Sequence, residues 1–206
     1  MLPSLHFDRV AHIGHFPQRP GGAARLSYEG IGLSVSVYPD AWSQIARLSG
    51  EEMWLQRIDG QPGRFVDGYA VRKQAFAHGL KVGWLQSVPG WRVSYFDDDF
   101  DQDRFYETRD PEDAEGAREE GHQVDECTIS IATGDLRARL QSYLGPDRDV
   151  EGATEGEVVN RYVHAVDASA DGVWWQHELD PSVLSAPAGL ILPERIADWR
   201  VVEIAS

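Results

Sequence analysis

Short runs of alternating apolar and polar residues, bounded by glycine and proline, dominate the first half of the chain. Residues 32–38 (GLSVSVY) are the clearest case, because the leucine and the two valines fall on one face and the serines and the tyrosine on the other. This alternation is typical of a half-buried β-strand. We predict further strands over residues 53–58, 64–71, 81–85 and 91–96, with turns at the glycine and proline residues between them.

Helical spacing is clearest in the second half of the chain. Residues 155–168 carry apolar side chains at intervals of three and four, which predicts a helix with one buried face. Shorter helices are predicted over residues 41–48, after a capping Asp40, and over residues 133–143. The strands predicted in this half cover residues 127–132, 172–175, 189–192 and 200–204. The pattern indicates an α+β domain with a mostly antiparallel sheet and short helices.

The length of 206 residues fits a single domain spanning residues 1–206. Hydrophobic residues make up 42% of the chain, a content that separates it from disordered acidic proteins. Because Cys127 is the single cysteine, neither an intramolecular disulfide nor a cysteine-rich zinc site is expected. The sequence has no recognisable secretory leader or membrane-spanning apolar run, so we expect a cytoplasmic protein without a membrane partner.

Negative charge is concentrated in one segment. The formal net charge is −15, and residues 97–126 carry −11 of it, with 14 acidic and three basic residues. Such a protein is not expected to bind nucleic acid through phosphate contacts. Two interpretations of the segment are open: a hydrated excursion with few apolar residues, or a phosphate-mimicking arm that occupies a basic partner.

The first candidate site residues lie near the N-terminus. His12 and His15 flank Ile13-Gly14, but the stretch lacks a helical pattern and a third ligand, so no metal site is predicted. A neutral imidazole at His12 offers one donor and one acceptor, which suits it to orienting a ribose hydroxyl. A purely structural histidine is the alternative.

The predicted strand over residues 32–38 is the second candidate. Gly32 allows a ligand to approach the backbone closely, and Ser34 and Ser36 supply small hydroxyl groups. An ordinary edge strand flanked by glycine would have the same sequence pattern.

The third candidate is the stretch DGVWWQHELD over residues 171–180. It brings Trp174 and Trp175 near Glu178 and Asp180 in the sequence. An indole can desolvate a carboxylate and raise its pKa, or stack on a flat ligand. A carboxylate can stabilise the cation that forms when an N-glycosidic bond breaks. Core packing of both indoles is the alternative.

Nucleophilic catalysis finds little support. Cys127 begins a β-type run and has no adjacent base, as expected of a small buried thiol. The sequence contains neither a Gly-x-Ser-x-Gly elbow nor a phosphate-binding P-loop.

These pieces, in this order, resemble the ADP-ribosyltransferase-like fold. One block is His12-Ile13-Gly14 followed by GLSVSVYPDAW (residues 32–42), and the other is DGVWW (residues 171–175) followed by GLILPERI (residues 189–196). The resemblance implies two small packed sheets with an NAD-binding cleft between them. The chain departs from better-known members because it has no Gln-x-Glu or Glu-x-Glu pair before the final strands and no Ser-Thr-Ser triplet.

The resemblance also implies roles for individual residues. NAD would be the substrate, and ADP-ribose would be transferred to a macromolecular acceptor, as by a toxin-type effector, or NAD would be hydrolysed. His12 would orient the adenosine-side ribose, and Gly14 would let the backbone reach the nicotinamide amide. Glu178, with Asp180 as the alternative, would be the catalytic carboxylate. The residues implied to bind NAD are His12, Gly14, Gly32, Ser34, Ser36, Tyr38 and Trp174.

Three functions remain open at this point: an NAD-dependent transferase, a non-enzymatic acidic binding or inhibitor protein that engages a basic partner through residues 97–126, and a structural domain without a small-molecule site. The enzyme requires Glu178 or Asp180, His12 and a serine of residues 32–38 to converge on one cleft. The binding protein requires residues 97–126 to be ordered, alone or with the partner.

Overall fold

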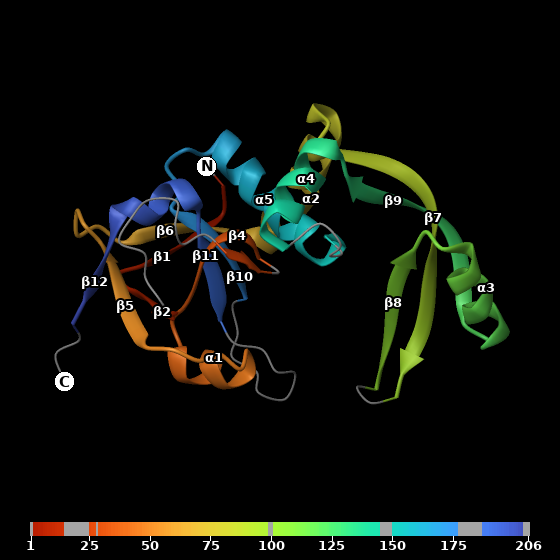
Figure 1. The fold of residues 1–206 in the computed structure, drawn as a ribbon, viewed down its shortest axis with the longest axis horizontal. Coiled ribbons are helices and arrows are strands. Elements are labelled where there is room, and N and C mark those ends of the chain that lie inside the picture. The colour runs from red at the N-terminus through yellow and green to blue at the C-terminus, as the bar shows by residue number, and fades with distance from the viewer. Residues whose placement is uncertain are drawn as a thin grey trace.

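A computed structural model describes residues 2–14, 25–27, 29–98, 101–144, 150–176 and 187–203 (Figure 1). Its strands are β1 (Ser4–Phe7), β2 (Val10–Ile13), β3 (Arg25–Ser27), β4 (Gly30–Ser36), β5 (Glu52–Arg57), β6 (Gly63–Asp67), β7 (Leu85–Asp97), β8 (Gln102–Thr108), β9 (Gln123–Ala132), β10 (Gly172–Gln176), β11 (Ala188–Ile191) and β12 (Trp199–Val202). Its helices are α1 (Pro39–Ile45), α2 (Gly68–Val82), α3 (Pro111–Glu119), α4 (Gly134–Leu144) and α5 (Glu151–Val166), with a 3-10 helix over Pro193–Asp198. No helix in these ranges has the length and apolar character needed to cross a membrane.

The strands form one large sheet and one small sheet. The large sheet has nine strands in the order β1-β6-β10-β11-β4-β2-β5-β12, with β3 paired to β4. The small sheet has three strands in the order β8-β7-β9. Among the described pairs, β6 and β10 run parallel and the others antiparallel. The prediction of a mixed architecture with mostly antiparallel sheets and short helices is confirmed, although the two sheets differ greatly in size.

The large sheet curls around an apolar core. Trp199 on β12 lies at one end of the strand order, and its ring centroid is 5.9 Å from that of Phe65 on β6, near the other end. A side chain at Gly63 would collide with the Trp199 ring, so this glycine permits the approach of the two edges. The residues buried inside the curl are Val10, Leu33, Val35, Leu55, Phe65, Trp174, Ile191, Ile196 and Trp199.

A second core lies where α2, α4 and α5 meet the large sheet. The valine stripe predicted for residues 155–168 is the buried face of α5. Asp67 caps the N-terminus of helix α2, because its side chain accepts a hydrogen bond from the Ala70 amide at 3.0 Å. The helix ends at Val82 and is followed by Gly83, which adopts the left-handed conformation that glycine tolerates best.

Helix α2 covers residues for which a strand was predicted. The strand predicted over residues 64–71 is confirmed for residues 64–67, which lie in β6, but residues 68–71 begin the helix, and the strand predicted over residues 81–85 starts only at Leu85. The buried residues of α2 are Gly68, Val71, Ala75 and Gly79. These mostly small residues recur at helical spacing but form no hydrophobic stripe, so the short apolar runs at each end have the sequence pattern of strands. The two glycines lie against large neighbours, because a Cβ on Gly68 would approach the Trp175 ring at 2.9 Å.

Strand β7 runs through Pro89-Gly90, where a break was predicted. Pro89 pairs with Thr128 on β9. On the other side, β8 pairs with β7 only from Trp91 onward. Proline is tolerated at such a free edge because the missing N–H removes no ladder hydrogen bond.

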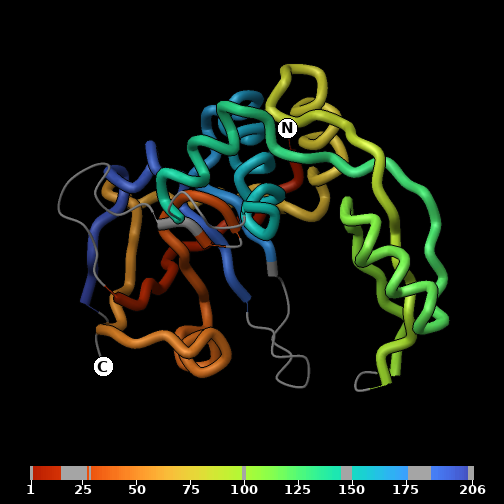
Figure 2. The backbone as a smooth tube through the Cα atoms, turned by 45° about the vertical axis from the view of Figure 1, so that its right-hand side comes forward, coloured from red at the N-terminus to blue at the C-terminus, as the bar shows by residue number. Residues whose placement is uncertain are grey.

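The small sheet and α3 form an arm, defined here as residues 85–132, that projects from the body (Figures 1 and 2). Leu85 and Ala132 at its base join the core beneath the helices. Helix α3 covers one face of the arm, where Val93, Ala114 and Ala117 are buried. The acidic segment 97–126 is therefore an excursion from the body, but an ordered one in its described part, as the binding-protein hypothesis requires.

Candidate functional site

Four of the residues predicted to bind NAD lie on the adjacent strands β2 and β4: His12, Gly32, Ser34 and Ser36. The Nδ1 of His12 donates a hydrogen bond to the carbonyl oxygen of Ser34 at 2.9 Å. Ser36 is fully buried, and its hydroxyl donates to the carbonyl oxygen of Pro187 and accepts from the Tyr38 amide at 3.0 Å. These contacts hold the end of β4 between its neighbours, so the polar groups already serve the fold.

Gly32 and Trp174 serve the interior of the sheet. A Cβ on Gly32 would lie 2.2 Å from the Leu190 side chain, so this glycine gives space to β11 and not to a ligand. Trp174 is 1% exposed, and its ring centroid is 4.4 Å from that of Phe7. Stacking of Trp174 on nicotinamide would require the core to open.

Of the remaining predicted residues, two follow the strands β2 and β4 and two lie outside the described ranges. Gly14 follows β2 with φ of 128° and donates its N–H to the Glu51 carbonyl at 3.0 Å. Tyr38 is 51% exposed after β4. Glu178 and Asp180 lie outside the described residues, so their catalytic role stays a prediction.

The arm presents a second candidate site on the sheet face opposite α3. Side chains alternate along a strand, and directly paired residues share a face. The register of β7 with β8 and β9 therefore gathers one set of side chains on the face away from Val93. We call this set the open face: Arg92, Ser94, Phe96, Asp103, Phe105, Glu107, Gln123 and Asp125.

Two large aromatic side chains of the open face are exposed to solvent. Phe96 is 54% and Phe105 61% exposed. Arg92 holds Phe105 in place, because its guanidinium carbon lies 4.7 Å from the ring centroid and its Nη2 lies 2.7 Å from Oε1 of Glu107. The open face is thus a mainly polar surface that presents two exposed aromatic rings among three carboxylates.

Cys127 lies on β9 opposite Gly90. Loss of solvent raises the pKa of its thiol, which disfavours the reactive thiolate. Within the described ranges, no three His, Cys, Asp or Glu side chains gather as possible metal ligands.

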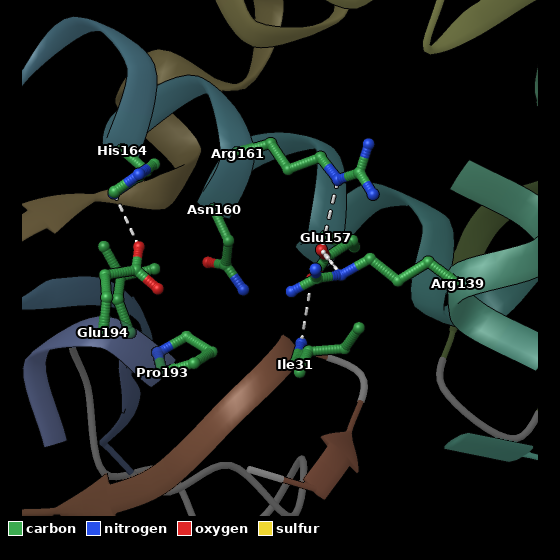
Figure 3. Close-up of a pocket in the computed structure, with 9 residues that line it drawn as sticks. Ile31, Arg139, Glu157, Asn160, Arg161, His164, Pro193 and Glu194 are labelled. Atoms are coloured by element: carbon green, nitrogen blue, oxygen red, sulfur yellow. Dashed lines mark hydrogen bonds and ion pairs between the residues drawn. The ribbon is translucent and has the colours of Figure 1, made fainter. Parts of the chain in front are cut away.

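A third polar cluster lines a cavity of about 190 Å³ beside α5 (Figure 3). Glu157 is 2% exposed, and its Oε2 accepts a hydrogen bond from the Ile31 amide at 3.1 Å. Its Oε1 lies 3.0 Å from Nε of Arg139 and 3.3 Å from Nε of Arg161. Burial raises the pKa of the Glu157 carboxyl, although both guanidinium groups and the Ile31 amide oppose the rise.

This cluster was not predicted from the sequence, because the valine stripe of residues 155–168 was the only pattern considered on this helix. Glu157, Asn160, Arg161 and His164 recur at intervals of three, four and seven on the same helix. That spacing places them on a second, polar face, which is the signal that could have identified them.

Comparison of the chain with family models, with curated proteins and with solved structures found no match.

Proposed function

We propose that this protein is a non-enzymatic binding protein that engages a cationic protein through the open face of the arm. The observation that carries the proposal is the exposure of Phe96 and Phe105 on a carboxylate-rich sheet face that projects from the body. Exposed aromatic residues that a fold holds in place are typical of partner-binding surfaces.

Charge and apolar area would contribute to different steps of binding. Residues 97–126 carry −11, so the arm attracts a cationic surface and raises the association rate, most strongly at low salt. Burial of Phe96 and Phe105 would then slow dissociation, because apolar burial depends little on ionic strength. Arg92 already fixes the Phe105 ring, so less side-chain entropy is lost on binding.

Affinity capture tests this proposal. The immobilised protein is compared with the double variant Phe96→Ser/Phe105→Ser and with the control Ile58→Ser, since Ile58 is a similarly exposed apolar residue on the body, at 56%. We expect a basic protein to be retained by the original chain and by the control and to be lost from the double variant. Retention of the same proteins by all three would contradict the proposal.

NAD chemistry is a second candidate, supported by strand register at one end of the large sheet. The segment that carries Glu178 leaves β10 after Gln176 and enters β11 at Ala188, whose partner on β4 is Ser36. That segment therefore ends beside Ser36 on β4, the strand that is adjacent to β2 and His12. Gly32 and Trp174 do not fit the site, because packing occupies both.

Calorimetric titration with NAD and an assay of nicotinamide release test the second candidate on the original chain and on Glu178→Gln. Binding with release that the substitution abolishes would support a transferase or hydrolase. Absence of both heat and release would remove this candidate and leave the open-face proposal intact.

A further inference from the structure

Another cavity, of about 170 Å³, lies in the elbow where the arm meets the body. Glu107 and Arg109, near the end of β8, line its arm side, and Val150 and Thr154 line the side formed by α5. An ion pair joins the two sides, because Nη2 of Arg109 lies 2.7 Å from Oε1 of Glu151. The junction itself therefore forms this cavity, which we call the elbow cavity.

The elbow cavity adjoins the open face. Glu107 belongs to the open face and also lines the cavity. Ile129 and Ile131 lie an even number of residues beyond Asp125 on β9, so alternation places their side chains on the face that carries Asp125. The packing at Gly90 agrees, because a Cβ on this glycine would lie 2.2 Å from Cδ1 of Ile129. A chain bound along the open face would therefore reach the cavity with its next residue.

Arg137 of α4 brings a cation into the elbow cavity. The neighbouring charged groups are paired, since Arg109 contacts Glu151, and Glu107 contacts Arg92. Arg137 lines the cavity, is exposed to solvent, and forms no ion pair within the described ranges. An anionic group that entered the cavity would meet a guanidinium without a competing carboxylate, and a carboxylate can accept two parallel hydrogen bonds from such a group.

We propose that the elbow cavity binds the C-terminal residue of a protein partner whose chain ends in basic residues followed by an apolar one. The terminal carboxylate would pair with Arg137, and the last side chain would pack on Ile129, Ile131 and Val150. The preceding basic side chains would lie along the open face, among its carboxylates and beside Phe105.

The order of the charges supports this choice of occupant. A cation lies at the foot of the open face and carboxylates lie along it, which is complementary to a terminal carboxylate that follows basic residues. The inference rests on the proposed function, and it names the part of the partner that the open face and the elbow cavity would hold together.

The size of the cavity limits what enters it. A volume of about 170 Å³ is smaller than the roughly 300–1,000 Å³ of pockets for drug-sized ligands, so it suits one side chain with its carboxylate. The isoleucine and valine side chains give it an apolar wall. Leucine or valine at the C-terminus fits these constraints.

The first test uses the unchanged protein and varies only the end of a probe peptide. The probe is an N-acetylated hexapeptide, all lysine except for a C-terminal leucine, and it is titrated by calorimetry as the free acid and as the C-terminal amide. Because the amide is the more positively charged peptide, attraction to the acidic arm alone would make it the tighter ligand. We expect instead that the free acid binds at least about tenfold more tightly.

The second test changes the protein at an exposed position. Arg137→Gln should weaken binding of the free acid by about tenfold and leave binding of the amide unchanged, so the preference disappears. The matched control Arg118→Gln, on an exposed position of α3, should keep the preference. A free-acid peptide that ends in serine should bind more weakly than the leucine peptide, because it leaves the apolar wall uncovered.

The proposal is overturned if the amide binds as tightly as the free acid, if Arg137→Gln leaves the preference unchanged, or if neither peptide binds. In each of these cases the open-face proposal would still stand if affinity capture retains a basic protein that the variant Phe96→Ser/Phe105→Ser loses. The failure of the elbow inference and the failure of the proposed function are therefore distinguishable.

Discussion

Arg57, at the end of β5, donates a hydrogen bond from Nη1 to Oδ1 of Asp171, the residue before β10. Three strands, β11, β4 and β2, separate β10 from β5 in the sheet order, so the ion pair crosses the curl of the sheet. Asp171 is 1% exposed, and its Oδ2 accepts a hydrogen bond from the Arg64 amide at 2.8 Å. The pair joins both halves of the nine-stranded sheet next to the Trp199 contact.

Replacement of Arg57 by methionine should destabilise the protein by about 3 kcal/mol, because Asp171 would keep a buried charge without its counter-ion. The free energy of unfolding measured in denaturant tests this expectation. Asp59→Asn is the matched control, since it removes the solvent-exposed partner of the same guanidinium. If both variants are equally stable, the pair across the curl does not hold the sheet closed.

Gly32→Ala should destabilise the protein by about 1–3 kcal/mol, because the new Cβ would collide with Leu190 and push β11 from β4. Gly116→Ala makes the same chemical change on α3, where a Cβ meets no atom within 4 Å. It should stabilise the protein by up to about 1 kcal/mol through helix propensity. Thermal unfolding of both variants measures the difference in stability. If Gly32→Ala does not lower the stability, Gly32 would again be a candidate for contact with a ligand.

The ion pair between Arg64 and Asp167 should make stability depend on pH in the acid range. A hydrogen bond from Arg64 lowers the pKa of Asp167 from 3.8 to about 2. Because the folded-state pKa lies below the unfolded value, the contribution is complete above about pH 4 and disappears as pH falls towards 2.

Asp167→Asn should therefore cost about 1 kcal/mol at pH 7, after allowance for solvent screening, and almost nothing at pH 2. Denaturant unfolding of both proteins at the two pH values gives the comparison. If the free energies of unfolding of the two proteins differ as much at pH 2 as at pH 7, the charge of the Asp167 carboxylate is not what stabilises the fold.

The sequence correctly predicted those helices and strands in which apolar residues repeat at one regular interval. The alternating run of residues 32–38 corresponds to β4, and the valine stripe of residues 155–168 to α5. Helix α2 was missed because its buried face consists mainly of glycine and alanine, which carry little hydrophobic signal. The order of the strands in the curled sheet depends on long-range contacts such as Trp199 with Phe65, and no local pattern encodes those.

Some features of the candidate sites could be predicted from the sequence and others could not. The concentration of acidic residues identified the arm as a candidate site. Because that segment contains few apolar residues, its sequence did not predict an ordered structure. The arm is packed through small side chains, since Ala114 and Ala117 of α3 are buried against the sheet together with Val93. The exposure of Phe105 could not be predicted, because it follows from the register of β8 on β7.

The central claim concerns a specific face of the arm and not its overall charge. Two triple variants separate these possibilities, because each removes three negative charges from the arm. One is Asp103→Asn/Glu107→Gln/Asp125→Asn on the open face. The other is Glu112→Gln/Glu115→Gln/Glu119→Gln on exposed positions of α3.

The most direct measurement is the dissociation constant of the captured basic protein with the original chain and with both triple variants at one salt concentration. The account predicts at least about tenfold weaker binding to the open-face variant and a much smaller change for the α3 variant. Equal weakening of both, or no weakening of the open-face variant, would contradict it.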